Sequence, residues 1–284
     1  MKRFLESRRT HSGVKWILQG LPLDMTVTRR HGTGQAPSVI REESHGLETY
    51  SFPLDKDLSE IDFCDIGDLN LPGDDLCRSL FIIESVSSRF FDMGKRVASF
   101  GGEHLVTLPV VKAAVKTFGD LVVIHMDAHA DLREKYHGMK YNHATVMRWI
   151  AEECLVSPGS LYQFCIRSGT REEFEWGMAN TSFYPGELLR PLGKCLERIN
   201  EKPVYITIDI DSVEPAEAPG TGTPEPCGTP AREIFEALYE MKGLNVVGFD
   251  IVEVSPPHDV NNVTSVLAAK MARECLIMWG GDNC

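Results

Sequence analysis

Apolar residues fall into two kinds of segment that alternate along the chain. Short runs rich in valine and isoleucine are typical of strands, and six occur, at residues 14–21, 96–104, 120–132, 160–169, 203–213 and 244–256. Stretches with apolar residues three and four apart are typical of amphipathic helices, and they cover residues 105–120, 144–155, 230–243 and 263–281. This alternation predicts an α/β protein with a mostly parallel sheet and helices on both faces.

Nothing in the pattern divides the chain. The strand-like runs continue from residue 14 to about residue 254, without an internal repeat, a low-complexity tract or a Pro/Ser-rich linker. The composition, 43% hydrophobic and 25% charged over 284 residues, is that of a globular protein with a large core. We therefore expect a single domain over residues 1–284.

Acidic and histidine side chains gather where strand-like runs end. Four runs are followed by such groups: Glu103 and His104, residues 127–131, Asp209 with Asp211, and Glu253. In open α/β sheets the ligand lies in the crevice outside the carboxyl ends of the strands. These groups are distant in sequence, yet the fold class predicts that they converge.

The most informative run is DAHAD, in which Asp127, His129 and Asp131 alternate with alanines. Alternate residues of an extended chain share a face, so two carboxylates and an imidazole point into the same space. They would repel and desolvate one another unless a cation neutralises the carboxylates. The run therefore indicates a metal site, although a solvated strand end is the ordinary alternative.

Two further motifs extend this set. Asp209 and Asp211 repeat the alternate spacing, and His104 follows a double glycine that lets backbone approach a site, although acidic strand ends and lone histidines are often structural. The six side chains could hold two ions that share carboxylates. Oxygen ligands with some imidazole favour Mn²⁺, with Fe²⁺, Co²⁺ or Zn²⁺ as alternatives, and the lack of cysteine disfavours structural zinc.

Net charge, apolar segments and cysteine content limit which binding partners and which cell compartment fit this sequence. The formal net charge of −12 disfavours nucleic acid and anionic membranes as partners and mildly favours a cationic substrate. A stretch of roughly 20 apolar residues and the apolar run of a signal peptide are both lacking, so we expect a cytoplasmic protein without a membrane partner. The eight cysteines are scattered without a CxxC pair and are expected to be mostly buried thiols.

The runs GGEH, DAHAD, DIDSVEPAEAPGTGTPEPCG and VEVSP, in this order, resemble the signatures of the ureohydrolase family, which includes arginases and agmatinases. The resemblance covers nearly the whole chain. It implies a three-layer α/β/α sandwich on an eight-stranded sheet, a homo-oligomer (trimer or hexamer) and two Mn²⁺ per subunit. It also implies the ligand sets: Asp127 and Asp209 bridging, His104 with Asp131 at one ion, and His129 with Asp211 at the other.

The same resemblance implies hydrolysis of a guanidine compound by hydroxide formed between the ions. His143 matches the family's catalytic histidine; the residues alone suggest a helix start capped by Asn142, where a surface histidine is equally ordinary. Glu253 would anchor the guanidinium through paired hydrogen bonds, and Thr223 in the GTGTP turn could place a hydroxyl near it or serve the turn alone.

Two other histidines and two departures from the family pattern accompany these motifs. His125 is expected to pack behind the ligands, and His137 to lie at the rim of the site. Glu103 stands where the family often has Asp, and Glu214 where the stretch usually reads Asp-Pro. Neither is an expected ligand, so the departures concern the geometry of the loops.

The sequence indicates the substrate less clearly than it indicates the fold or the metal site. The run after Asp131 resembles the agmatinase branch, which implies agmatine as the small cationic substrate, with putrescine and urea as products. Arg133 and Lys135 could instead suit a carboxylate-tailed guanidine such as guanidinobutyrate, and aminopropylagmatine and arginine are further alternatives. Rival classes are a two-metal phosphoesterase, for which no basic clamp is evident, a one-zinc deacetylase, and a metal-binding relative without activity.

Overall fold

The computed structural model describes residues 2–153, 156–157, 159–199 and 201–281. Its centre is an eight-stranded sheet in which every pair of neighbouring strands is parallel, in the order β4-β1-β5-β10-β9-β6-β7-β8. The strands are β1 (Trp16–Leu21), β4 (Phe63–Asp68), β5 (Arg96–Gly101), β6 (Val122–Met126), β7 (Leu161–Phe164), β8 (Ser182–Tyr184), β9 (Pro203–Asp209) and β10 (Asn245–Val252).

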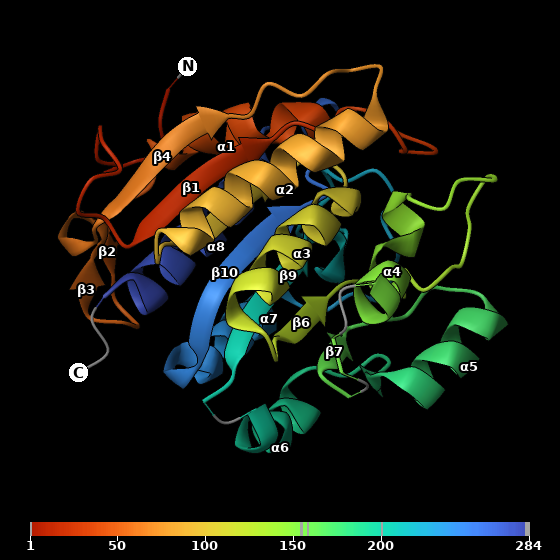
Figure 1. Cartoon of the computed structure of the whole chain (residues 1–284). Coiled ribbons are helices and arrows are strands. Elements are labelled where there is room, and N and C mark those ends of the chain that lie inside the picture. The colour runs from red at the N-terminus through yellow and green to blue at the C-terminus, as the bar shows by residue number, and fades with distance from the viewer. Residues whose placement is uncertain (1, 154–155, 158, 200, 282–284) are drawn as a thin grey trace.

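Helices cover both faces of this sheet (Figure 1). One buried apolar cluster joins the sheet to α1 (Ala36–Ser44), α6 (Leu189–Ile199), α7 (Ala231–Glu240) and α8 (Val263–Gly280). The cluster on the other face joins it to α2 (Leu76–Asp92), α3 (Thr107–Phe118), α4 (Val146–Glu153) and α5 (Arg171–Asn180). Two cores separated by a parallel sheet confirm the predicted three-layer α/β/α sandwich.

All six predicted strand runs contribute a strand, but the pattern missed both edges of the sheet. Edge strand β4 carries Asp65 and Asp68, and edge strand β8 has only three residues, so neither reads as an apolar run. The short hairpin of β2 (Tyr50–Ser51) and β3 (Lys56–Asp57) was also missed. All four predicted helices are present; residues 154 and 155, the end of the stretch predicted as 144–155, lie outside the described residues.

The strands that carry the polar motifs are neighbours. The order β5-β10-β9-β6 places four adjacent strands in the middle of the sheet, and each of them ends at one of the predicted motifs. Because the strands are parallel, their carboxyl ends meet at the same edge. The topology thus brings together groups that lie up to about 150 residues apart in sequence, as in the contact between His104 and Glu253.

Most of the described cysteines are buried thiols, as expected. Cys64, Cys165, Cys195 and Cys275 are buried, whereas Cys77 and Cys227 are exposed. Residues 154 and 284, the other two cysteines, lie outside the described residues. Among the described helices, none has the length and apolar character needed to cross a membrane.

Glu153 ties the end of α4 to α3 and to the loop that precedes it. Its carboxylate contacts Lys112 at 2.6 Å and Lys140 at 2.5 Å, and accepts a hydrogen bond from the Tyr141 hydroxyl at 3.0 Å. Burial opposes ionisation, but these partners outweigh it and lower the pKa of Glu153 to about 2. Since the folded-state pKa lies below the usual 4.5, the stabilisation is present above pH 4.5 and is lost as the pH falls toward 2.

Glu153→Gln is therefore expected to lower the free energy of unfolding at pH 7 by about 1 kcal/mol, a modest figure because the side chain is 23% exposed. The gap to the parent protein should narrow as the pH falls below 4.5. Urea unfolding at pH 7 and at pH 3 measures both. Glu152→Gln, which removes only an exposed pair with Arg148, is the matched control, and a gap that persists at low pH would refute the ionic origin.

Candidate metal centre and active-site cavity

The predicted metal ligands follow the ends of three of the four central strands, β5, β9 and β6, with β10 between β5 and β9. His104 begins a short 3₁₀ helix after β5, Asp127 directly follows β6, and Asp209 ends β9. Asp131 adopts a left-handed backbone conformation with φ of 54°, as does Glu253 after β10 with φ of 63°. Such conformations are costly for residues other than glycine and cluster at functional sites.

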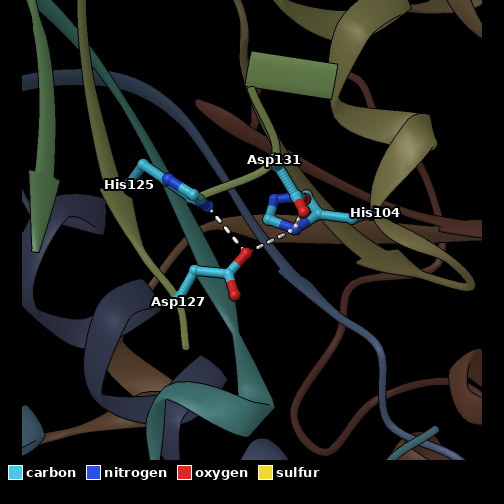
Figure 2. Close-up of side chains that lie close together, drawn as sticks. All are labelled: His104, His125, Asp127 and Asp131. Carbon is cyan, nitrogen blue, oxygen red and sulfur yellow. Dashed lines mark hydrogen bonds and ion pairs between the residues drawn. The ribbon is translucent and has the colours of Figure 1, made fainter. Parts of the chain in front are cut away.

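Three carboxylates converge on one ring nitrogen of His104. Its Nδ1 lies 3.1 Å from Asp127 Oδ2, 3.2 Å from Asp209 Oδ2 and 3.4 Å from Asp131 Oδ2. Figure 2 shows Asp127 and Asp131 facing this ring. The opposite nitrogen, Nε2, is 2.9 Å from the Thr207 hydroxyl, which leaves Nδ1 toward the carboxylates.

A second group lies beside the first and shares Asp127 with it. His129 Nδ1 is 2.9 Å from Asp211 Oδ2 and 3.6 Å from Asp127 Oδ1. Asp127, His129 and Asp211 each offer a ligand atom within 4.8 Å of the others, and Asp127 belongs equally to the first group. The six predicted ligands therefore come together as two overlapping sets.

His125 also lies in the first group, but its two ring nitrogens are already engaged. The Gln163 amide nitrogen contacts the Ala130 carbonyl at 2.9 Å and His125 Nδ1 at 3.1 Å. A carbonyl can only accept, so this amide atom is a donor, and His125 Nδ1 accepts its second hydrogen. His125 Nε2 then carries the proton and donates to Asp127 Oδ2 at 2.8 Å (Figure 2). His125 thus supports Asp127 from behind, as the sequence predicted.

Gln163→Met is expected to weaken metal binding about tenfold to a hundredfold, the usual cost of losing a group that orients a ligand. The change keeps the side-chain length but removes the donor that sets the proton on His125. Isothermal titration with Mn²⁺ measures the affinity. Gln19→Met, a buried glutamine on β1 bonded to Ser87 and Ser99, is the matched control, and equal losses in both variants would contradict the assignment.

The charges of the cluster fit divalent cations. Burial raises the pKa of Asp131 well above its usual value, and Asp127 adds to this; burial together with Asp211 and Asp127 does the same for Asp209. Two buried ligand atoms, His104 Nδ1 and Asp211 Oδ2, have no hydrogen-bond partner among the described residues. A divalent cation among these carboxylates would offset their repulsion and give the open ligand atoms a partner.

A cavity of about 270 Å³ opens onto the cluster. Several predicted metal ligands line it. Its other lining residues include His143, Glu253, Thr223, Arg133 and Tyr136. His137 is not among its lining residues and packs its ring against Tyr136, with centroids 4.4 Å apart. The cavity is therefore a polar pocket whose lining includes part of the His/Asp cluster.

His143 stands at the start of a helix, as predicted. The Asn142 side chain accepts from the Ala144 backbone N–H at 3.0 Å and forms a reciprocal cap with Thr145. His143 is 16% exposed, and burial lowers its pKa to about 4. Its ring is therefore neutral at pH 7 and able to accept a proton.

Glu253 faces the cavity from the end of β10. Its Oε1 accepts a hydrogen bond from the His104 backbone N–H at 2.7 Å, and its own N–H donates to the Gly102 carbonyl at 2.9 Å. Burial raises the pKa of Glu253 to about 8. The carboxylate is thus held rigidly beside the cluster, and a cation next to it would favour its ionised form. Thr223 lies in the same cavity, half-buried, as the GTGTP turn allows.

The two departures from the family pattern have structural partners. Glu214 Oε2 accepts from the Gly228 N–H at 2.6 Å and closes the loop after β9. Glu103 is fully buried and bonded to the segment around Thr26. Sequence reasoning missed Thr207, Gln163 and Thr26. Of these three residues, only Thr207 could have been found from the sequence, because it stands two residues before Asp209 on the same face of β9.

Taken together, the parallel sandwich and the two overlapping His/Asp sets define a binuclear-metal hydrolase. The arginase family model matches residues 14–278. The agmatinase of Bacillus anthracis is 43% identical over 281 residues, which are 98% of this chain and 96% of that protein. The chain belongs to the arginase family of ureohydrolases.

Solved structures agree with this membership. The agmatine ureohydrolase of Thermoplasma volcanium is similar with a TM-score of 0.89 and 34% identity, covering 98% of this chain and 94% of that one. The proclavaminate amidino hydrolase of Streptomyces clavuligerus also has a TM-score of 0.89, at 28% identity, covering 99% and 97%. The fold therefore serves relatives whose substrates differ.

Proposed function

We propose that this protein hydrolyses agmatine to putrescine and urea. The observation that carries the proposal is the near full-length similarity to agmatinases, 43% identical in Bacillus anthracis and 44% in Bacillus subtilis. It is supported by a cavity that sets the carboxylate of Glu253 beside the His/Asp cluster, because a guanidinium ion pairs well with such a carboxylate.

We further propose two Mn²⁺ per chain. His104 and Asp131 would hold one ion and His129 and Asp211 the other, with Asp127 and Asp209 shared. The contacts of His104 Nδ1 and the position of Asp127 in both sets support this division. Divalent ions in such a site lower the pKa of water and stabilise developing negative charge. The mixture of carboxylate oxygen and imidazole ligands supports Mn²⁺.

The remaining chemistry belongs to side chains around the cavity. Glu253 accepts N–H bonds from the guanidinium and offsets its charge while water adds to the central carbon. His143, neutral at pH 7, accepts the proton that the water gives up and passes it to the alkyl nitrogen as the carbon–nitrogen bond breaks. Thr223 also lines the cavity, and its hydroxyl would form a hydrogen bond with the guanidinium.

Agmatine fits the cavity better than a guanidine with a carboxylate tail. Arg133 lines the cavity, but its Nε lies 3.3 Å from Glu173 and its guanidinium stacks on the Tyr136 ring at 4.5 Å. Lys135 is not a lining residue of this cavity. The cation that would receive a carboxylate is therefore already paired with Glu173.

Urea release tests the proposal directly. Mn²⁺-loaded protein is incubated separately with agmatine, arginine, guanidinobutyrate and aminopropylagmatine, and elemental analysis counts the ions per chain. We expect kcat/KM for agmatine to exceed the others by at least about tenfold, a difference of roughly 1.4 kcal/mol in the transition state. Preference for guanidinobutyrate would overturn the argument from Arg133, and fewer than two ions per chain would overturn the binuclear site.

Three properties of the whole protein complete the proposal: a single domain over residues 1–284, a homo-oligomer of three or six chains, and a cytoplasmic location. The continuous sheet supports the single domain, because its eight strands come from segments spread over residues 16–252. Light scattering on the purified protein distinguishes a trimer or a hexamer from a monomer.

A further inference from the structure

Glu103 is a buried carboxylate that takes no direct part in the proposed chemistry. It precedes His104, has no exposed surface and is not a lining residue of the cavity. Its Oε1 accepts from the backbone N–H groups of Met25 at 2.7 Å and Thr26 at 2.8 Å, and the Thr26 hydroxyl donates to Oε2. Burial raises the pKa of Glu103, and the three donors act against burial by favouring the ionised carboxylate.

Thr26 in turn holds the residues at the start of the helix that carries His143. Its carbonyl accepts from the Asn142 side-chain amide at 3.2 Å, and its hydroxyl oxygen accepts from the His143 backbone N–H at 3.0 Å. The same oxygen lies 3.5 Å from His143 Nδ1, and Glu103 Oε2 lies 4.0 Å from that nitrogen. Glu103, Thr26 and His143 therefore form one continuous chain of contacts.

The direction of these hydrogen bonds follows from counting hydrogens. A threonine hydroxyl has a single hydrogen, and here a carboxylate, which can only accept, receives it. The hydroxyl oxygen can then offer only lone pairs to His143, and this contact of 3.5 Å favours a hydrogen on the ring nitrogen that faces it. The negative charge of Glu103 close to Nδ1 acts in the same direction.

We propose that Glu103 and Thr26 are positioning residues that hold His143 as the tautomer with its hydrogen on Nδ1, leaving Nε2 free to accept a proton in the cavity. This inference rests on the proposed role of His143 as the proton carrier. With the opposite tautomer the basic nitrogen faces Thr26, away from the reacting atoms. The chain of contacts thus determines which nitrogen of the ring can accept a proton in the cavity.

Glu103→Gln tests this assignment with almost no change of shape. The two backbone N–H groups at Met25 and Thr26 require the amide oxygen, so the amide NH₂ turns toward the Thr26 hydroxyl. The hydroxyl must then accept from the amide and donate its own hydrogen to His143 Nδ1, which favours the tautomer with hydrogen on Nε2. The substitution therefore reverses the hydrogen-bond chain.

Nitrogen NMR of the labelled imidazoles, in full-length protein loaded with diamagnetic Zn²⁺, reads the tautomer; the signal missing from His143→Asn gives the assignment. We expect hydrogen on Nδ1 in the parent protein and a shift toward Nε2 in Glu103→Gln. The Mn²⁺-loaded variant should lose kcat about tenfold to a hundredfold, with KM for agmatine and metal content unchanged. Hydrogen on Nε2 in the parent, or the same tautomer in both proteins, would overturn the inference.

A second pair of variants covers the case in which Glu103→Gln does not fold. Thr26→Ser keeps the hydroxyl and should keep both the parent tautomer of His143 and the parent kcat. Thr26→Val removes the hydroxyl, so the preference for hydrogen on Nδ1 should disappear and kcat should fall. Equal effects of the two would refute the assignment. Glu84→Gln on α2, the same change at an ion pair with Lys116 of α3, is the control. If the parent protein releases urea from none of the guanidines, the proposed function fails, while the NMR result still decides the tautomer.

Discussion

Asp127→Asn is expected to lose bound metal and hydrolytic activity together, with a fall in kcat of at least about a thousandfold. Asp127 belongs to both ligand sets, so its substitution is expected to affect both proposed ions. Both of its oxygens also accept hydrogen bonds, Oδ2 from His125 Nε2 and Oδ1 from the His129 backbone N–H at 2.6 Å. An amide has one oxygen, so its NH₂ must face one of these donors.

Elemental analysis after gel filtration and urea release from agmatine measure the two losses on the same sample. Circular dichroism confirms that the variant is folded. Asp120→Asn is the matched control, because Asp120 pairs with Lys202 at the surface, at the opposite end of β6. A variant that keeps two ions per chain would show that Asp127 is not shared between them.

Glu253→Gln is expected to separate activity from metal binding. The glutamine oxygen can still accept the hydrogen bond from the His104 backbone N–H, so the local backbone and the ligands remain in place. Its NH₂ then faces the guanidinium, and a donor meets a donor where the carboxylate accepted. We expect kcat/KM for agmatine to fall about a hundredfold, or roughly 3 kcal/mol, the scale of a hydrogen bond to a charged group.

The two substitutions together test how the roles are divided. Metal content should stay at two ions per chain in Glu253→Gln and fall in Asp127→Asn. Glu240→Gln, an exposed carboxylate at the end of α7, controls for the loss of one negative charge. Equal metal loss in the Glu253 and Asp127 variants would contradict the assignment of Glu253 to the substrate.

The candidate site was predictable where chemistry and local spacing coincide. Asp127, His129 and Asp131 stand two residues apart after an apolar strand, and in an extended chain this spacing predicts a shared face. The three side chains do converge, although β6 ends at Met126 and Asp131 has a left-handed backbone. His104 and Asp209 could be added because parallel strands end at a common edge. The same reasoning could not tell that Asp127 would contact both histidines, since register across the sheet depends on the packing of whole strands.

Other residues gave no usable signal. Gln163 and Thr26 are ordinary residues in the sequence, and their importance comes from partners more than 30 residues away. Arg133 was a candidate for binding a carboxylate until its pairing with Glu173 and stacking on Tyr136 were visible. The edge strands were missed because an edge needs only a short or partly polar segment, which has no strong period.

The sequence by itself determined the alternation of strands and helices, the strand ends that carry acidic and histidine groups, and the resemblance to the ureohydrolases. These features depend on periodicity and on residues close together in the chain. Only the tertiary structure decided the strand order that gathers the motifs, the support of Asp127 by His125, and the contacts of Glu103 and Thr26 with His143. Each of these is a hydrogen bond or a pairing between distant segments, and its geometry exists only once the sheet and both helical layers have packed.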